Sequence, residues 1–143
     1  MPEIIGIDPI YVTVSDVAVS EKFYDTVMAA LGFKKNRFPV NDEKHIQYYN
    51  CHFGYVLRPA RLQRPHDAYA PGLHHLCFRV DGKRELQEAA RKLTEAGVAK
   101  PYAEYASDYF AFFFLDRDGL RLEITHYRLE RRQRHDDWES PAS

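Results

Sequence analysis

The hydrophobic positions of the chain fall into two series that follow the same order. In the first series, residues 10–14 form a short β-branched run that predicts a strand. Residues 17–31 then carry apolar side chains at helical spacing on a stripe that begins at Val19, and Gly32 stands where a helix C-cap is expected. Three short segments bounded by turn residues follow, and we expect strands at 33–38, 45–49 and 53–57.

The second series repeats this order. Residues 73–80 predict a strand, residues 83–96 carry a second helical stripe, and Gly97 again stands at the C-cap position. The closing strands are expected at 102–105, 109–115 and 120–127. A tight turn at 116–119 separates the last two strands. Both halves therefore have the predicted order strand, helix, strand, strand, strand.

This repeat predicts an α+β fold of two βαβββ modules, whose curved mixed sheets surround a cupped site. The modules are residues 6–58 and 73–127 of a single domain that spans residues 1–143. A proline-containing linker, 59–72, joins them, and a charged tail, 128–143, follows. The charges of the tail cancel, so we expect a solvated extension rather than an arm that binds nucleic acid.

Alternation along the strands decides which side chains face the cup, because successive residues of a strand point to opposite faces. On the strand at 73–80, the apolar row packs under the helix and His75 lies in the opposite row. On the closing strand, Glu123 lies in the corresponding row. His45 and Gln47 are placed on the inner face of the first module. The predicted substrate pocket comprises Tyr11, Thr13, Gln47, Tyr55, Cys77, Arg79 and Arg121.

Composition narrows the class of protein. With 45% hydrophobic and 29% charged residues among 143, the chain is expected to be globular and not disordered. Its net charge of −1 provides no basic field for nucleic acid, and its apolar runs are too short to cross a bilayer. The N-terminus has no secretion signal, and two cysteines are too few for a disulfide framework. We therefore expect a cytoplasmic protein that binds a small molecule.

Five sequence segments are distinctive enough to compare with known families: IDPIYVTVSD, EKFYD and LGF in the first half, and GLHHLCFRV and YFAFFFLDRDGLRLEITHY in the second. Together they resemble the vicinal oxygen chelate superfamily, which includes glyoxalase I, bleomycin and fosfomycin resistance proteins, extradiol dioxygenases and methylmalonyl-CoA epimerase. The resemblance covers residues 6–127, and DRDGLRLEI is its most specific part. The superfamily's fold of two βαβββ modules agrees with the repeat described above.

The resemblance implies metal-ligand positions in the second module. In metal-dependent members the ligands come from the first and last strands of each module, and His75 and Glu123 match those positions. Imidazole nitrogen and carboxylate oxygen suit Zn, Ni, Mn or Fe in an open site. The alternative is a hydrogen-bonded pair that no longer binds a metal, since two protein ligands are few for a tight divalent site.

The first module departs from the metal-binding pattern. Pro9 stands where these members usually have a ligand histidine, and proline has no ligand atom. Near the other ligand position, the sequence has Tyr55 and Leu57 in place of the usual carboxylate or amide. His45 or Gln47 is a candidate for a third ligand from a neighbouring strand. A bound divalent metal would therefore have few protein ligands.

Two functions from different classes follow from the resemblance. The first is metal-assisted chemistry of the lactoylglutathione lyase type, by a lyase, isomerase or dioxygenase in which Glu123 is the catalytic residue that moves a proton. The second is a metal-free binding protein for a drug or antibiotic, of the bleomycin-resistance type. Pro9 favours the second function, whereas the retained His75 and Glu123 favour the first. In either case the resemblance implies a homodimer that binds a small molecule.

Cys77 has two interpretations of its own. A nearby cation such as Arg79 would lower the pKa of the thiol and make it reactive. Without that effect the residue is a small hydrophobe packed in the sheet, and this second interpretation is the one we prefer.

Overall fold

The computed structural model describes residues 1–99, 103–106 and 109–139, and the first module forms a four-stranded sheet with one helix. Its elements are β1 (Ile10–Val14), α1 (Val17–Ala30), β2 (Lys34–Val40), β3 (Glu43–Tyr49) and β4 (Gly54–Pro59). The strand order is β1-β4-β3-β2, with β1 parallel to β4 and the other pairs antiparallel. A sheet with both kinds of pairing is mixed, as the sequence predicts.

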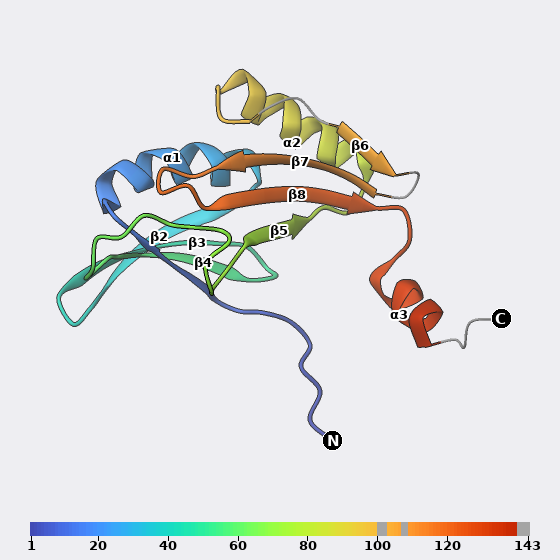
Figure 1. The fold of residues 1–143 in the computed structure, drawn as a ribbon, viewed down its shortest axis with the longest axis horizontal. Coiled ribbons are helices and arrows are strands. Elements are labelled where there is room, and N and C mark those ends of the chain that lie inside the picture. Colours follow the sequence, from blue (N-terminus) through green and yellow to red (C-terminus); the bar gives the residue numbers. More distant parts are fainter. Residues whose placement is uncertain (100–102, 107–108, 140–143) are drawn as a thin grey trace. The chain divides into compact units, whose positions relative to one another are not determined.

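The second module repeats this topology. Its elements are β5 (His75–Arg79), α2 (Lys83–Glu95), β6 (Ala103–Ala106), β7 (Tyr109–Leu115) and β8 (Arg121–Tyr127), in the strand order β5-β8-β7-β6. Strand β5 is parallel to β8 (Figure 1). The pair β1 and β4 of the first module is parallel in the same way. The predicted α+β fold of two βαβββ modules is therefore confirmed. One expected strand began at Tyr102, which lies outside the described residues.

The local sequence of helix α1 provides an N-cap, one apolar face and a glycine after its C-terminus. The Asp16 carboxylate accepts a hydrogen bond from the backbone N–H of Val19 at 3.0 Å and so caps the first turn. After the helix, Gly32 has a φ of +78°, a left-handed conformation that glycine adopts without strain. The buried face consists of Ser20, Phe23, Tyr24, Val27 and Met28. The predicted stripe was wrong at its first position, since Val19 is 47% exposed.

Helix α2 packs on the second sheet through a short apolar stripe. Its buried residues are Leu86, Ala89, Ala90 and Leu93, and they face β8, whose Leu122 and Ile124 are fully buried. The stripe repeats every three or four residues, which is the spacing of one helical face. In the described part of the chain, none of the helices is both long enough and apolar enough to cross a membrane.

The chain divides into two compact units whose boundaries do not coincide with the modules. The first unit contains Met1–His74 together with Leu115–Leu120, and the second contains His75–Phe114 and Arg121–Ser143. Residues 115–120, which connect β7 to β8, therefore pack with the first unit. Helix α3 (Arg131–Glu139) follows in the second unit and has no buried residue, as expected of a solvated tail.

A buried hydrogen-bonded chain attaches the β7–β8 turn to the core of the first unit. The Tyr24 hydroxyl donates to Asp116 Oδ2 at 2.7 Å and lies 2.9 Å from the Tyr55 hydroxyl. Asp116 Oδ1 accepts the backbone N–H groups of Asp118 and Leu120 at 2.9 and 2.8 Å. The buried carboxylate thus exchanges water for three protein donors, which is the condition for burying a charge at tolerable cost.

A second polar cluster joins α1 to β2 and β3. Glu21, only 12% exposed, accepts from Lys35 at 2.7 Å, from Lys44 at 3.1 Å and from Arg37. Burial alone would raise the pKa of this carboxyl. The hydrogen bonds from Lys35, Lys44 and Arg37 outweigh that effect and lower the pKa to about 2.

We expect Tyr24→Phe to destabilise the protein by about 1–3 kcal/mol, because it leaves the Tyr55 hydroxyl and one oxygen of buried Asp116 without their partner. The midpoint of urea unfolding should fall while the denaturant slope stays the same. Tyr69→Phe is the matched control, since Tyr69 is exposed and its loss should change stability by no more than about 0.5 kcal/mol. Equal stability of the two variants would contradict the role given to the Tyr24 hydroxyl.

The lowered pKa of Glu21 predicts acid sensitivity. A carboxyl with a folded-state pKa below its unfolded value stabilises the fold above the unfolded value, and this stability is lost as pH falls. The contribution of Glu21 should therefore be complete above about pH 5 and disappear toward pH 2, with a size on the order of 2 kcal/mol. We would measure the free energy of unfolding in urea between pH 2 and pH 5. It should fall less steeply with decreasing pH in Glu21→Gln than in wild type. Exposed Glu3→Gln is the control and should retain the wild-type pH dependence.

Candidate functional site

The second unit brings His75 and Glu123 into direct contact. Strands β5 and β8 are parallel neighbours, and their register places Glu123 opposite Cys77, two residues beyond His75. His75 Nε2 donates to Glu123 Oε2 at 2.9 Å. The Glu123 side chain is 4% exposed, whereas the His75 side chain is 34% exposed and reaches the surface. Alternation along two strands thus predicted a contact between residues that are far apart in the sequence.

The Glu123 carboxylate has two more protein donors. The Tyr109 hydroxyl of β7 donates to Oε1, and the Cys77 thiol also hydrogen-bonds to the carboxylate. Burial, together with the hydrogen bond to Glu123, raises the pKa of Tyr109, so this hydroxyl keeps its proton at neutral pH. The Tyr109 ring stacks on that of Tyr127, with centroids 5.2 Å apart. Glu123 is therefore a buried carboxylate that protein donors hold in one orientation.

Tyr109 is a site residue that the sequence analysis missed. Both faces of its strand carry aromatic residues, so the alternation of β7 has no polar row to mark the functional face. The available signal was the strand's register with β8, because a hydroxyl on the same face as Glu123 meets the carboxylate. That register depends on the turn between the strands, which the apolar pattern alone does not define.

Cys77 is an unreactive thiol in this environment. The residue as a whole is exposed, but its sulfur lies against Glu123. Loss of hydration and the adjacent negative charge raise the pKa of the thiol to about 12. Arg79 does not act on the thiol as the first interpretation required, because its guanidinium pairs with Glu130 at 3.0 Å. A reactive thiolate at this position is therefore not supported.

The two arginines of the predicted pocket are both held by other groups of the second unit. Arg121 lies opposite His75 in the register, and its guanidinium carbon is 4.2 Å from the centroid of the Phe113 ring. Arg79 lies opposite Thr125 and forms its ion pair with Glu130. Both arginines therefore lie on the two strands that carry His75 and Glu123. Arg121 is directly opposite His75, and Arg79 is two residues beyond Cys77, which is opposite Glu123.

The first unit contains the other predicted pocket residues. Tyr11 is half exposed, and its ring meets the edge of the His45 ring at 6.1 Å. His45 is buried, and its Nδ1 lies 2.9 Å from the carbonyl oxygen of Glu43. Gln47 donates to Asn36 at 3.2 Å. Their neighbour Tyr48 bonds to α1, so alternation places His45 and Gln47 on the face away from the helix, as predicted.

Tyr55 was wrongly assigned to the pocket. It is fully buried, and its hydroxyl bonds to Tyr24 of α1. The register pairs Tyr55 with Tyr48, so both side chains lie on the face that packs under the helix. Leu57 is also fully buried and pairs with Ile46 on that face. Neither residue offers a group to a ligand on the opposite face.

The residues present supply two metal-binding groups at His75 and Glu123. Across the described ranges, no set of three His, Cys, Asp or Glu side chains is placed to hold one ion. Pro9 has no ligand atom, and it lies beside Gly54, where an added Cβ would sit 3.4 Å from the proline Cβ. The chemistry of the pair therefore fits two positions of an open site and does not form a closed structural one.

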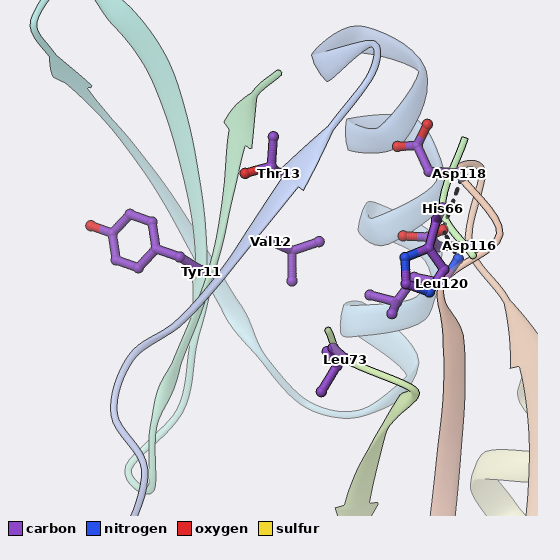
Figure 2. A pocket seen from close by; sticks show the side chains of 8 residues that line it. All are labelled: Tyr11, Val12, Thr13, His66, Leu73, Asp116, Asp118 and Leu120. Atoms are coloured by element: carbon purple, nitrogen blue, oxygen red, sulfur yellow. Dashed lines mark hydrogen bonds between the residues drawn. The ribbon is translucent and has the colours of Figure 1, made fainter. Parts of the chain in front are cut away.

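A separate pocket of about 200 Å³ lies in the first unit, beside the β7–β8 turn (Figure 2). Its lining consists of Tyr11, Val12, Thr13, His66, Leu73, Asp116, Asp118 and Leu120. The Tyr11 ring points to the opposite side of β1 from the Val12 side chain, so the Val12 side faces the linker and turn residues (Figure 2). The sequence analysis named Tyr11 and Thr13 but missed the pocket, because the linker and the turn complete its wall.

Comparison of the sequence with family models gives one match. The model described as the Glyoxalase/Bleomycin resistance protein/Dioxygenase superfamily matches residues 6–124, which is most of the chain. No curated protein sequence matches the chain at a significant level.

Solved structures share the fold at low sequence identity. A glyoxylase/bleomycin resistance protein/dioxygenase domain from Frankia sp. EAN1pec has a TM-score of 0.73 at 24% identity, covering 88% of this chain and 100% of that one. A fosfomycin resistance protein from Listeria monocytogenes has a TM-score of 0.67 at 17% identity, with coverages of 93% and 99%. For a lactoylglutathione lyase from Agrobacterium tumefaciens the values are 0.65, 17%, 87% and 96%. These similarities show the fold alone.

The raised pKa of Cys77 predicts slow alkylation. At about pH 8 iodoacetamide should modify exposed Cys51 well before Cys77, as peptide mass spectrometry would show. Glu123→Gln removes the charge that raises the pKa, and the rate at Cys77 should rise about threefold for each unit by which the pKa falls. Glu95→Gln removes an exposed carboxylate of α2 whose partner is Arg91, and it should leave the rate unchanged. Equal rates at Cys51 and Cys77 in wild type would contradict this description of the site.

Proposed function

Because the chain belongs to the Glyoxalase/Bleomycin resistance protein/Dioxygenase superfamily, we propose that it binds and transforms a small molecule at the sheet face that carries His75 and Glu123. The observation that carries this proposal is the contact between the imidazole nitrogen and a buried carboxylate on adjacent parallel strands. A buried charge is costly unless it is paired, so such groups mark functional faces more often than plain packing surfaces. Arg79 and Arg121 beside the pair favour a ligand that carries oxygen atoms.

The proposed reaction is assisted by a divalent metal. His75 Nε2 and Glu123 Oε2 are 2.9 Å apart, close to the spacing of two ligands on one ion when each bond is about 2.1 Å and the angle is near 90°. The donor types suit Zn, Ni, Mn or Fe. When bound, the ion would polarise a substrate oxygen and stabilise negative charge on it. With two protein ligands, the remaining coordination positions are open to water and substrate.

Within this proposal the residues around Glu123 have distinct tasks. Glu123 is the group that accepts and returns a proton, because it is the carboxylate of the pair. Tyr109 keeps its own proton and holds Oε1, so it orients the carboxylate without competing as a base. The thiol of Cys77 stays protonated for the same reason and acts as a further donor.

A second candidate function is metal-free binding of a drug or antibiotic. It is favoured by the protein donors on Glu123, since His75, Tyr109 and Cys77 already occupy most of the acceptor positions of this carboxylate without an ion. In this case the pair and its aromatic neighbours would form the wall of a binding site, and no proton transfer is required. Either function fits the homodimer implied by the family resemblance.

Metal titration separates the two candidates. We expect metal-stripped protein to bind Ni, Zn or Mn weakly by calorimetry and to lose the ion on dialysis, because two protein ligands are few. Glu123→Gln should abolish the binding, since an amide is a poorer ligand than a carboxylate for these ions. Glu130→Gln, an exposed carboxylate of the same unit, is the control and should bind as wild type does.

The metal-assisted function would be refuted by wild-type protein that binds none of the three ions at millimolar concentration. Metal binding that survives in Glu123→Gln would also contradict it, because the ion would then lie elsewhere. A folded variant is required for either conclusion, and circular dichroism of Glu123→Gln supplies that check. The metal-free function would then be the one left to test, with drug-sized ligands.

A further inference from the structure

We propose that the pocket of the first unit beside the β7–β8 turn is a binding site for a small organic cation, a protonated amine on a compact apolar body. This site is separate from the function proposed for His75 and Glu123, and none of its lining residues belongs to the second unit. The proposal rests on the size of the pocket, the charge of its lining and one buried nitrogen that lacks a partner.

The size of the pocket suits a ligand of about one aromatic ring. A cavity of about 150 Å³ accepts benzene, so a pocket of about 200 Å³ has room for a ring and a short polar arm. Val12, Leu73 and Leu120 supply apolar side chains to the wall. Val12 and Leu120 are almost fully buried, which fixes two sides of the wall in the packed core.

The lining is negatively charged. Asp116 and Asp118 are its ionisable acids, and no lysine or arginine belongs to it. The side chain between them in sequence, Arg117, places its guanidinium carbon 5.5 Å from the ring centroid of Phe23. In the described part of the chain, neither aspartate forms an ion pair. A cationic ligand would therefore meet two carboxylates whose charge is not neutralised by a neighbouring cation.

The carboxylates also have hydrogen-bonding capacity left. A carboxylate has about four acceptor positions. Asp116 uses three of them, for Tyr24 and for two backbone N–H groups of the turn. Asp118 uses two, for the backbone N–H and the hydroxyl of Ser15. The remaining positions can accept N–H donors from an ammonium group without disturbing these contacts.

His66 supplies the second polar feature of the pocket. Its Nε2 is buried and has no hydrogen-bond partner among the residues that the structure describes. Buried polar atoms are nearly always paired, so this nitrogen has hydrogen-bonding capacity to offer a ligand in the pocket. His66 and the two aspartates lie on the same side of β1 as Val12 and Leu120 (Figure 2). We therefore place the ammonium group of the ligand on this side of the pocket, which the imidazole and the two carboxylates line.

The chemistry of the lining favours an organic cation over the other ligand classes. An anion would be repelled by Asp116 and Asp118. The described ranges contain no group of three His, Cys, Asp or Glu side chains placed to hold one metal ion, so His66, Asp116 and Asp118 are not arranged as a metal site. A neutral apolar molecule would contact the apolar side chains of the pocket. It would offer no hydrogen bond to His66 Nε2 or to the remaining acceptor positions of the carboxylates.

Three probes of similar size, each with one phenyl ring, test the charge requirement. We would titrate full-length protein with benzylammonium, benzyl alcohol and benzoate and follow backbone amide shifts by NMR. Benzylammonium should bind at least about tenfold more tightly than benzyl alcohol, and benzoate should not bind. The shifts should be largest at Val12, Leu73 and Leu120. Equal affinity for the alcohol and the ammonium, or shifts elsewhere on the chain, would overturn the proposal.

Two substitutions test the assigned residues. Asp118→Asn and His66→Leu should each weaken benzylammonium binding at least about threefold. Asp67→Asn removes a carboxylate next to His66 that does not line the pocket, and it should bind as wild type does. Wild-type affinity in both pocket variants would refute the site. Should Asp118→Asn fail to fold because Ser15 loses its acceptor, His66→Leu and the probe series still decide the outcome.

Discussion

The arrangement of the first unit depends on the hydrogen bonds that the buried Asp116 carboxylate accepts. It is buried, and a buried charge without partners would cost far more than the stability of a typical domain. Its donors come from α1, through Tyr24, and from the turn's own backbone at Asp118 and Leu120. Satisfying this one group therefore fixes the turn against the helix, and it sets Asp118 beside Ser15 at the start of α1.

Alternation predicted that His75 and Glu123 lie on one face of the second sheet, because their two strands each have one clearly apolar row. On β5 and β8 the buried Phe78, Leu122 and Ile124 mark the core side, so His75 and Glu123 follow on the other. The same logic fails where a strand has no contrast between its rows. Strand β4 has apolar residues on both faces at its centre, and Tyr55 was placed by family position instead of by register with Tyr48. The turn and linker that form the pocket of Figure 2 have no periodicity at all.

The His75–Glu123 pair shows why a motif position and a function are different claims. The contact itself is determined by the strand register, and a hydrogen bond satisfies it as well as a metal ion does. Tyr109 and Cys77 increase the number of donors on the same carboxylate. An incoming cation must therefore displace the proton that His75 shares with Glu123, so its affinity is reduced by the cost of breaking a good hydrogen bond. The presence of a histidine and a glutamate at the metal-ligand positions does not by itself reveal the energy needed to break this hydrogen bond.

The assignment of residues 115–120 to the first unit has a consequence for how the chain is made. Residues up to His74 leave the ribosome long before the turn does, yet the Tyr24 hydroxyl lacks its acceptor until Asp116 has emerged. The first unit therefore cannot complete its fold while only the N-terminal half of the chain has been made. Residues 115–120, which are synthesised later, supply the contact that completes it. Dividing the gene between the two βαβββ repeats would separate residues 115–120 from the unit in which they pack. The repeat alone would nevertheless suggest that position as the domain boundary.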